Sequence, residues 1–279
     1  MKKILNRIKR RLAGTAAKPE VAVPFSGFVE NRVFTPGIES MTDAELAELN
    51  AILPWRAFTV DSKGRRFGNL AWAGKRETPQ AVPDRRVVLL DERVPLGNRH
   101  VLEIGCFEGI HTVALSQRAG QVTAIDVRVE NVVKTIVRCS MFGTRPRVLL
   151  HNVEEGSLEA FACDVVHHVG VLYHLADPVR HLYELGRIAR HAIMLDTHFA
   201  KPESATDTYT SCGQTWKYRR HPEGGPQDVF SGAFDHAKWL ELSAIEKILG
   251  ECGFRDLERV EERAERNGPR VLLIGKKRT

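Results

Sequence analysis

The sequence predicts an α/β fold in which a mostly parallel sheet of seven strands is covered by helices and ends in an antiparallel hairpin. From residue 100 onward, short runs rich in Val, Ile and Leu alternate with amphipathic segments. Near-continuous apolar strands separated by helices are typical of a parallel sheet that is buried on both faces. The last two apolar runs are joined by Asn267-Gly268, a pair that favours a tight hairpin turn. A small α+β cap is expected before this sheet.

The chain begins with a basic amphipathic leader over residues 1–14. Its apolar residues recur at helical spacing up to Gly14, and cations fill the rest of the helix surface. Such a segment predicts peripheral contact with an anionic membrane through residues 1–12. The alternative is a solvated leader packed on the body. The apolar positions are Ile4, Leu5, Ile8 and Leu12.

Residues 15–98 are expected to form a linker and the N-terminal cap. The Pro- and Gly-containing stretch from Thr15 to about Asn31 lacks periodicity. Thr42 and Glu45 have the spacing of a capping box, which predicts a helix up to Pro54. Two β-prone runs within residues 57–71 predict a hairpin around Lys63-Gly64. Pro83-Asp84 predicts a further helix, which ends near Pro95.

Residues 99–279 are expected to form the main domain. Asp177-Pro178 is typical of a helix start, and Ser243 with Glu246 predicts another capping box. Residues 199–240 read as a structureless substrate insertion, and a loop of this length is usually a lid or a binding loop. The predicted strands are 101–104, 121–126, 147–151, 164–169, 191–196, 254–261 and 270–276, and the predicted helices are 109–118, 129–142, 154–161, 177–190 and 243–252.

Composition excludes several classes of protein. The formal charge of +6 comes from the leader, and the rest of the chain is balanced, which disfavours nucleic acid as a partner. No apolar run approaches the roughly 20 residues that span a bilayer. The five cysteines are scattered without a C-x-x-C pair, which favours a reducing compartment and gives no zinc signature. We therefore expect a cytoplasmic protein, membrane-peripheral if the leader binds lipid.

A glycine turn over residues 101–109 (VLEIGCFEG) is the most informative motif. Gly105 allows a sharp turn close to a ligand, and Gly109 allows a helix to start against the strand. Phe107 and Glu108 stand where a pyrophosphate site needs free amides, so the turn suits a ligand without phosphate. Asp126 ends the next strand about 20 residues later, where a carboxylate can accept the ribose hydroxyls of an adenosine.

These motifs resemble those of the class I S-adenosylmethionine-dependent methyltransferases, which have a Rossmann-like fold. The resemblance covers residues 100–276. It implies that Glu103 and Gly105 lie near the methionine end of S-adenosylmethionine and Asp126 on its ribose. Asn152 and Val153 would lie beside the adenine, although Asn152 could instead be a turn residue. The resemblance gives the predicted cofactor-binding residues as Glu103, Gly105, Cys106, Phe107, Gly109, Asp126, Val127, Asn152, Val153 and Val169.

The segment GVLYHLADP (170–178) resembles a signature of one branch of these enzymes. That branch includes small-molecule and sugar methyltransferases and tRNA wobble-uridine carboxymethyltransferases. His174 follows a strand end and is our first candidate for a general base, with a positioning role as the alternative. His198 is the second candidate. His167 and His168 lie inside a strand and are expected to be packing residues.

The sequence predicts no metal site. Asp196 and His198 offer two ligands of mixed type without a third in register, which is weak evidence for an ion. The insertion carries polar and aromatic side chains that could contact a ring-bearing acceptor, and its charges are balanced, which favours a small acceptor over tRNA. Together with Tyr173, the predicted substrate-binding residues are Trp216, Tyr218, Arg219 and His236.

The predicted function is therefore O-methylation of a sugar or another polar small molecule by S-adenosylmethionine, with a histidine base. The first alternative is a tRNA wobble-uridine modifying enzyme, for which the cluster at Arg65, Arg66, Lys75 and Arg76 could bind RNA. The second is a non-catalytic cofactor-binding protein on the same fold. An NAD-linked dehydrogenase is a more distant alternative. The sequence does not decide the oligomeric state.

Overall fold

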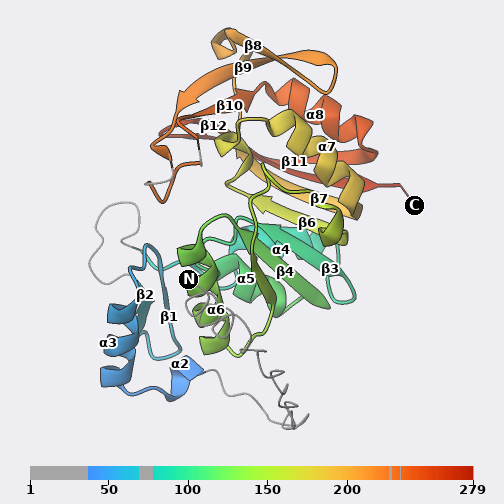
Figure 1. Cartoon of the computed structure of the whole chain (residues 1–279). Coiled ribbons are helices and arrows are strands. Elements are labelled where there is room, and N and C mark those ends of the chain that lie inside the picture. The colour runs from blue at the N-terminus through green and yellow to red at the C-terminus, as the bar shows by residue number, and fades with distance from the viewer. Residues whose placement is uncertain (1–36, 69–77, 226–227, 233, 279) are drawn as a thin grey trace, which may run out of the picture. The chain divides into compact units, whose positions relative to one another are not determined.

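The structure, a computed structural model, describes residues 37–68, 78–225, 228–232 and 234–278, all within the compact unit Thr35–Thr279. Its main sheet has seven strands in the order β11-β12-β7-β6-β3-β4-β5 (Figure 1). Neighbouring strands from β7 to β5 are parallel, and β12 is antiparallel to both β7 and β11. This confirms the predicted fold. The strands are β3 (His100–Ile104), β4 (Gln121–Asp126), β5 (Arg147–Leu150), β6 (Cys163–Val169), β7 (Ala189–His198), β11 (Phe254–Glu265) and β12 (Gly268–Lys277).

Helices cover both faces of this sheet. On one face, Leu90 of α4 and Leu115 of α5 pack with Val165 of β6 in a buried apolar cluster. On the other face, Leu182 of α7 and Ile248 of α8 belong to a larger cluster beneath the same strands. The helices are α4 (Arg85–Arg93), α5 (Ile110–Ser116), α6 (Val129–Met141), α7 (Pro178–Ile188) and α8 (Leu242–Glu251).

Most helix starts agree with the sequence signals. Thr42 and Glu45 form the predicted capping box of α3 (Asp43–Ile52). Asp84 caps α4, and Asp177 caps α7 with Pro178 in its first turn. The expected Ser243–Glu246 capping box is wrong, because α8 begins at Leu242 and Glu241 is its N-cap. The helix predicted over 154–161 is reduced to a 3₁₀ turn, η1 (Glu159–Phe161).

The N-terminal cap packs against α6. It consists of α2 (Gly37–Ser40), α3 and the predicted hairpin of β1 (Phe58–Val60) and β2 (Arg66–Gly68), which Figure 1 shows beside α6. Trp55 and Phe67 meet edge to face, with ring centroids 5.1 Å apart. These two rings are buried with Val137 and Met141 of α6 packed against their cluster.

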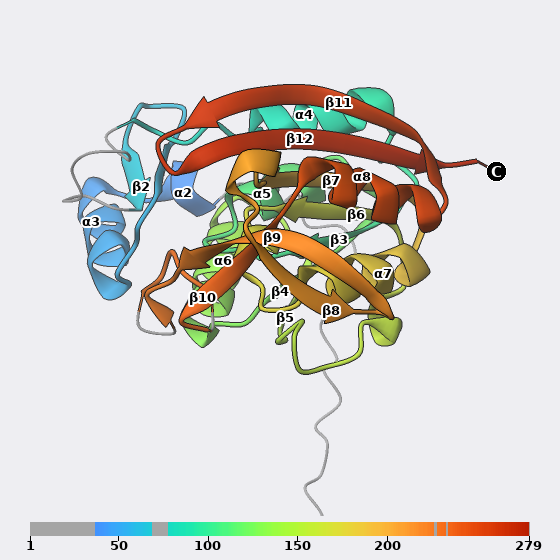
Figure 2. The same cartoon turned by 90° about the horizontal axis from the view of Figure 1, so that it is seen from above.

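The insertion over residues 199–240 is not structureless, which corrects the sequence analysis. It contains η3 (Pro202–Ser204) and an antiparallel sheet in the order β10-β9-β8, which Figure 2 shows beside the β11–β12 hairpin. Cys212 and Gly213 join β8 to β9, and both have positive φ, 51° and 74°. A two-residue turn of this conformation matches the twist of paired strands. The strands are β8 (Asp207–Ser211), β9 (Gln214–Pro222) and β10 (His236–Leu240).

Expectations for three stretches fall outside the described residues: the leader, the linker from Thr15 to about Asn31, and Lys75 and Arg76 of the basic cluster. The basic leader over residues 1–14 and its membrane contact concern residues that the structure does not describe. Among the helices that it does describe, none combines the length and the apolar character needed to cross a bilayer.

Candidate functional site

A cavity of about 710 Å³ lies at the carboxyl ends of β3, β4 and β6. Ligands of open α/β sheets bind at this edge. All the predicted cofactor residues except Gly109 line the cavity, and so do both candidate bases and Tyr173. The lining residues from the predicted set are Glu103, Gly105, Cys106, Phe107, Asp126, Val127, Asn152, Val153, Val169, Tyr173, His174 and His198.

The glycine turn has the backbone geometry that its sequence predicts. Gly105 and Gly109 have φ of +76° and +80°, which an L residue rarely adopts. A Cβ on Gly109 would lie 3.0 Å from the Cα of Thr135 in α6. Gly109 therefore allows close packing of the turn on α6. We expected it to contact the cofactor, but it is not among the residues that line the cavity. Phe107 also has positive φ, 50°, and its ring lies 5.8 Å from that of Phe230.

A Gly105→Ala variant should be less stable by about 1–2 kcal/mol, which is the cost of the left-handed conformation for an L residue. The added Cβ would also lie 2.3 Å from a methyl group of Val171. The second substitution Val171→Ala should recover only the part that is due to this contact. Urea unfolding of the two single variants and the double variant separates these effects. Unchanged stability in Gly105→Ala would contradict the assignment.

Asp126 closes β4 and organises the turn around it. Its carboxylate accepts hydrogen bonds from the backbone N–H of Phe107 (3.0 Å) and Arg128 (2.9 Å) and from Nδ2 of Asn131 (3.0 Å). Burial raises the pKa of Asp126, and these donors oppose the rise. A carboxylate has about four acceptor positions, so room is left for a ligand hydroxyl.

Glu103 lies on the floor of the cavity and is 2% exposed. Thr112 donates a hydrogen bond of 2.6 Å from Oγ1 to its Oε2. Burial raises the pKa of Glu103 to about 8, although this hydrogen bond acts in the opposite direction. Ionisation of Glu103 at neutral pH would therefore require a cation close to its carboxylate.

Glu108 has a role that the sequence analysis did not find. Its carboxylate is fully buried and accepts hydrogen bonds from the backbone N–H of Arg56 (2.7 Å) and Ala57 (2.9 Å). Lys134 of α6 donates to the same carboxylate over 2.9 Å. Glu108 thus fastens the N-terminal cap to the glycine turn. Pairing over more than 50 residues gives no local signal in the sequence.

His174 lies in η2 (Leu172–His174), directly after β6. Its Nδ1 is 2.9 Å from Oε1 of Glu223, and Oε2 of Glu223 accepts the N–H of Gly232 over 3.1 Å. Burial would raise the pKa of Glu223, but the bond with His174 and the other donors lower it. An ionised Glu223 favours a proton on Nδ1 of His174, which leaves the Nε2 lone pair available as a base.

His198 is held more tightly than His174. Its Nδ1 lies 3.0 Å from the carbonyl oxygen of Pro269, and its ring stacks on Trp239 with centroids 4.7 Å apart. The ring of Tyr173 meets it edge to face, also at 4.7 Å. Burial lowers the pKa of His198. Because the ring is fixed on three sides, His198 is suited to shaping the cavity wall.

Asp196 is neutralised by arginines. Arg263 bonds both of its oxygens, at 2.9 and 3.1 Å, Arg270 also contacts it, and Arg86 lies 3.8 Å away. Burial would raise the pKa of Asp196, and the three guanidinium groups lower it overall. Its oxygens are therefore occupied, and the weak Asp196–His198 metal pair considered from the sequence does not form.

The comparisons with known proteins agree with this geometry. Residues 102–192 match the family described as "Methyltransferase domain". The N-terminal domain of EvdMO1, crystallised with S-adenosylhomocysteine and D-fucose, superposes with a TM-score of 0.68 at 23% identity, over 85% of this chain and 98% of that one. Residues 102–192 therefore match a methyltransferase domain, and the described part of the chain has the class I methyltransferase fold. The cofactor of this class is S-adenosylmethionine.

Two curated relatives also match. A tRNA U34 carboxymethyltransferase from Methylococcus capsulatus is 38% identical over 177 residues, covering 60% of this chain and 51% of the relative. A ubiquinone biosynthesis O-methyltransferase from Nitrosospira multiformis is 24% identical over 176 residues, covering 60% and 67%. The chain thus spans about half the length of the first relative and two thirds of the second.

Most of the predicted substrate residues do not line the cavity. Trp216 and Tyr218 alternate with exposed residues on β9 and point into the core, where they are 4% and 9% exposed. The guanidinium of Arg219 lies over the ring of Trp239. His236 contacts Asp235 over 2.6 Å. Of the predicted substrate residues, only Tyr173 lines the cavity.

Other segments of the chain line the cavity instead. The cavity is lined by the segment Val229–Gly232, by the end of the β11–β12 hairpin and by Arg86 of α4. Arg128 joins the first of these segments to the cofactor side by donating to the carbonyl oxygens of Asp228 (2.9 Å) and Ser231 (2.7 Å). The hairpin turn was visible in the sequence, but nothing local indicated that it faces the site. The hairpin residues concerned are Glu265, Arg266, Asn267 and Arg270.

Proposed function

We propose that the protein transfers the methyl group of S-adenosylmethionine to a hydroxyl of a sugar or another small polar acceptor. The observation that carries this proposal is the His174–Glu223 pair at the cavity. Methyl transfer from a sulfonium requires alignment of nucleophile, methyl and sulfur, and a hydroxyl nucleophile must also lose its proton. A neutral histidine oriented by a carboxylate supplies that base.

The cavity lining supports an arrangement of the cofactor. Asp126 would accept a ribose hydroxyl, Asn152 and Val153 would lie beside the adenine, and Gly105 would allow the methionine end to approach the backbone. His174 follows β6, the strand next to β3, which supports a position near the methionine end of the cofactor. The D-fucose present with the EvdMO1 domain supports a sugar as the acceptor class.

The test is an acceptor screen read by release of S-adenosylhomocysteine, followed by kinetics of variants. We expect His174→Gln to lower kcat by about 10²–10⁴-fold, the usual contribution of a general base. Glu223→Gln should lower kcat by less and leave the Kd for the cofactor within twofold, and Glu223→Asp should restore part of the rate. His191→Gln, on β7 away from the cavity lining, is the control.

A His174→Gln variant with unchanged kcat would overturn the role of the base. If no acceptor yields product while the cofactor binds, the non-catalytic alternative gains support. These two results are distinct, because cofactor affinity is measured separately by calorimetry.

A second candidate is tRNA wobble-uridine modification. The 38% identical relative supports it, and so do the guanidinium groups of Arg86 and Arg270 at the cavity, which could accompany an anionic cofactor or acceptor. Both arginines, however, already face carboxylates. Binding of tRNA should weaken steeply with salt, and affinity independent of salt would exclude this candidate.

A further inference from the structure

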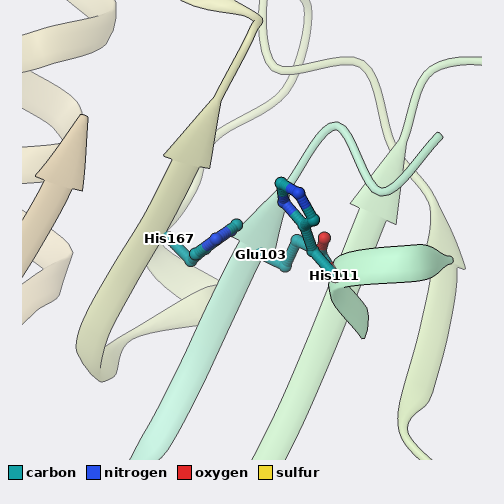
Figure 3. Close-up of side chains that lie close together, drawn as sticks. All are labelled: Glu103, His111 and His167. Carbon is teal, nitrogen blue, oxygen red and sulfur yellow. The ribbon is translucent and has the colours of Figure 1, made fainter. Parts of the chain in front are cut away.

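Three side chains from neighbouring elements converge beneath the cavity floor. Glu103 of β3 and His167 of β6 are direct partners in the register of these parallel strands, and His111 comes from the first turn of α5. One ligand atom of each side chain lies within 4.8 Å of those of the other two. Figure 3 shows the three side chains close together above the ends of the two strands.

His167 is the unusual member of this group. It is 1% exposed, and neither of its ring nitrogens has a hydrogen-bond partner among the described residues. Buried polar groups in folded proteins almost always have a partner, and a phenylalanine would fill the same volume without this cost. The ring of His111 meets that of His167 edge to face, with centroids 5.1 Å apart. A ligand between them would satisfy His167.

Glu103 and His111 each have one atom that could still coordinate such a ligand. Thr112 bonds Oε2 of Glu103, so Oε1 is left. Nε2 of His111 lies 3.4 Å from Oδ2 of Asp84 and 3.1 Å from Nη2 of Arg86. Arg86 can only donate, so without a metal ion Nε2 of His111 accepts this bond and the proton lies on Nδ1. Metal binding at Nδ1 would move the proton to Nε2 and would turn Arg86 away, with Oδ2 of Asp84 as the acceptor, as in carboxylate–histidine–metal triads. Asp84 balances the charge of Arg86, with which it pairs over 2.8 Å.

We propose that Glu103, His111 and His167 form a binding site for a divalent first-row transition-metal ion such as Zn²⁺. Two imidazoles and one carboxylate are ligands that favour zinc or iron over magnesium and calcium. Ligands about 2.1 Å from a tetrahedral ion lie roughly 3.4 Å apart, so the side chains close inward by about 1 Å on binding. Glu103 and His111 line the cavity, which gives the ion an entry path and an open coordination position.

The experiment uses the full chain without an affinity tag, stripped with a chelator and titrated with Zn²⁺ in the absence of cofactor and acceptor. We expect one equivalent of zinc by elemental analysis, and X-ray absorption with two imidazole nitrogens and oxygen at about 2.0–2.1 Å. His167→Phe and His111→Gln should each weaken binding by at least 100-fold. His191→Gln, which removes a histidine elsewhere on the sheet, should bind as the wild type does.

Zinc that binds equally well to His167→Phe and wild type, or no stoichiometric zinc in the wild type, would overturn the proposal. Circular dichroism checks that each variant is folded. If His167→Phe does not fold, His111→Gln and the absorption spectrum of the Co²⁺-loaded wild type decide the question. Metal content does not depend on turnover, so this result stands apart from the outcome of the acceptor screen.

Discussion

Replacement of Asp126 by Ala is expected to weaken binding of S-adenosylhomocysteine by about 100-fold or more. The substitution removes a charged acceptor, and a hydrogen bond to a charged group contributes about 1.5–3 kcal/mol. It also leaves the backbone N–H groups of Phe107 and Arg128 without their acceptor, so the glycine turn loses its shape. Isothermal titration calorimetry with S-adenosylhomocysteine measures the change, because this ligand needs no acceptor.

Asn131→Ala separates the two contributions to this loss. Asn131 donates to Asp126 over 3.0 Å but is not required to touch the ligand, so its removal should cost less than about fivefold. Asp256→Asn, an exposed carboxylate on β11, should leave the affinity unchanged. If Asp126→Ala binds within twofold of the wild type while remaining folded, the ribose contact is not made by this residue.

The fold and the cofactor edge could be predicted because their signals are local. Apolar runs define the strands of the main sheet, and the steric needs of Gly105 and the position of Asp126 identify the edge where ligands bind. Each of these signals lies within about 25 residues of sequence. The parallel register then brings the strand ends together without further information.

The acceptor side could not be predicted in the same way. His174 and Glu223 are 49 residues apart, and their pairing depends on how the β8–β10 sheet returns to the cavity. That sheet was itself missed, although Trp216 and Tyr218 alternate with exposed Thr215 and Lys217 in the manner of a strand with one buried face. The turn Cys212-Gly213 lacks the Asn or Asp that usually marks such hairpins. Trp216 and Tyr218, which the sequence analysis interpreted as substrate-binding residues, are therefore core residues.

The second large effect is expected from Lys134, whose ammonium group is buried against Glu108. Lys134 is 1% exposed and Glu108 is fully buried, and their charged atoms lie 2.9 Å apart. Lys134→Met leaves the buried carboxylate with weaker compensation, and breaking one side of such a pair typically costs about 3–5 kcal/mol. Arg138 softens the loss, because its Nη2 lies 3.9 Å from the same carboxylate. Urea unfolding measures the free energy.

The double variant Glu108→Gln/Lys134→Met determines how much of this cost is due to the unpaired charge. Gln removes the charge but has a single oxygen, so it keeps an acceptor for only one of the backbone N–H groups of Arg56 and Ala57. Because an unpaired buried charge costs more than one lost hydrogen bond, the double variant should still be more stable than Lys134→Met alone. Val133→Ala on the same helix, at an exposed position, should stay within about 0.5 kcal/mol of the wild type. If Lys134→Met lowers the free energy of unfolding by less than about 1 kcal/mol, Arg138 and the backbone N–H groups are sufficient to stabilise the Glu108 carboxylate. The Lys134–Glu108 pair would then not be needed to hold the cap and the glycine turn together.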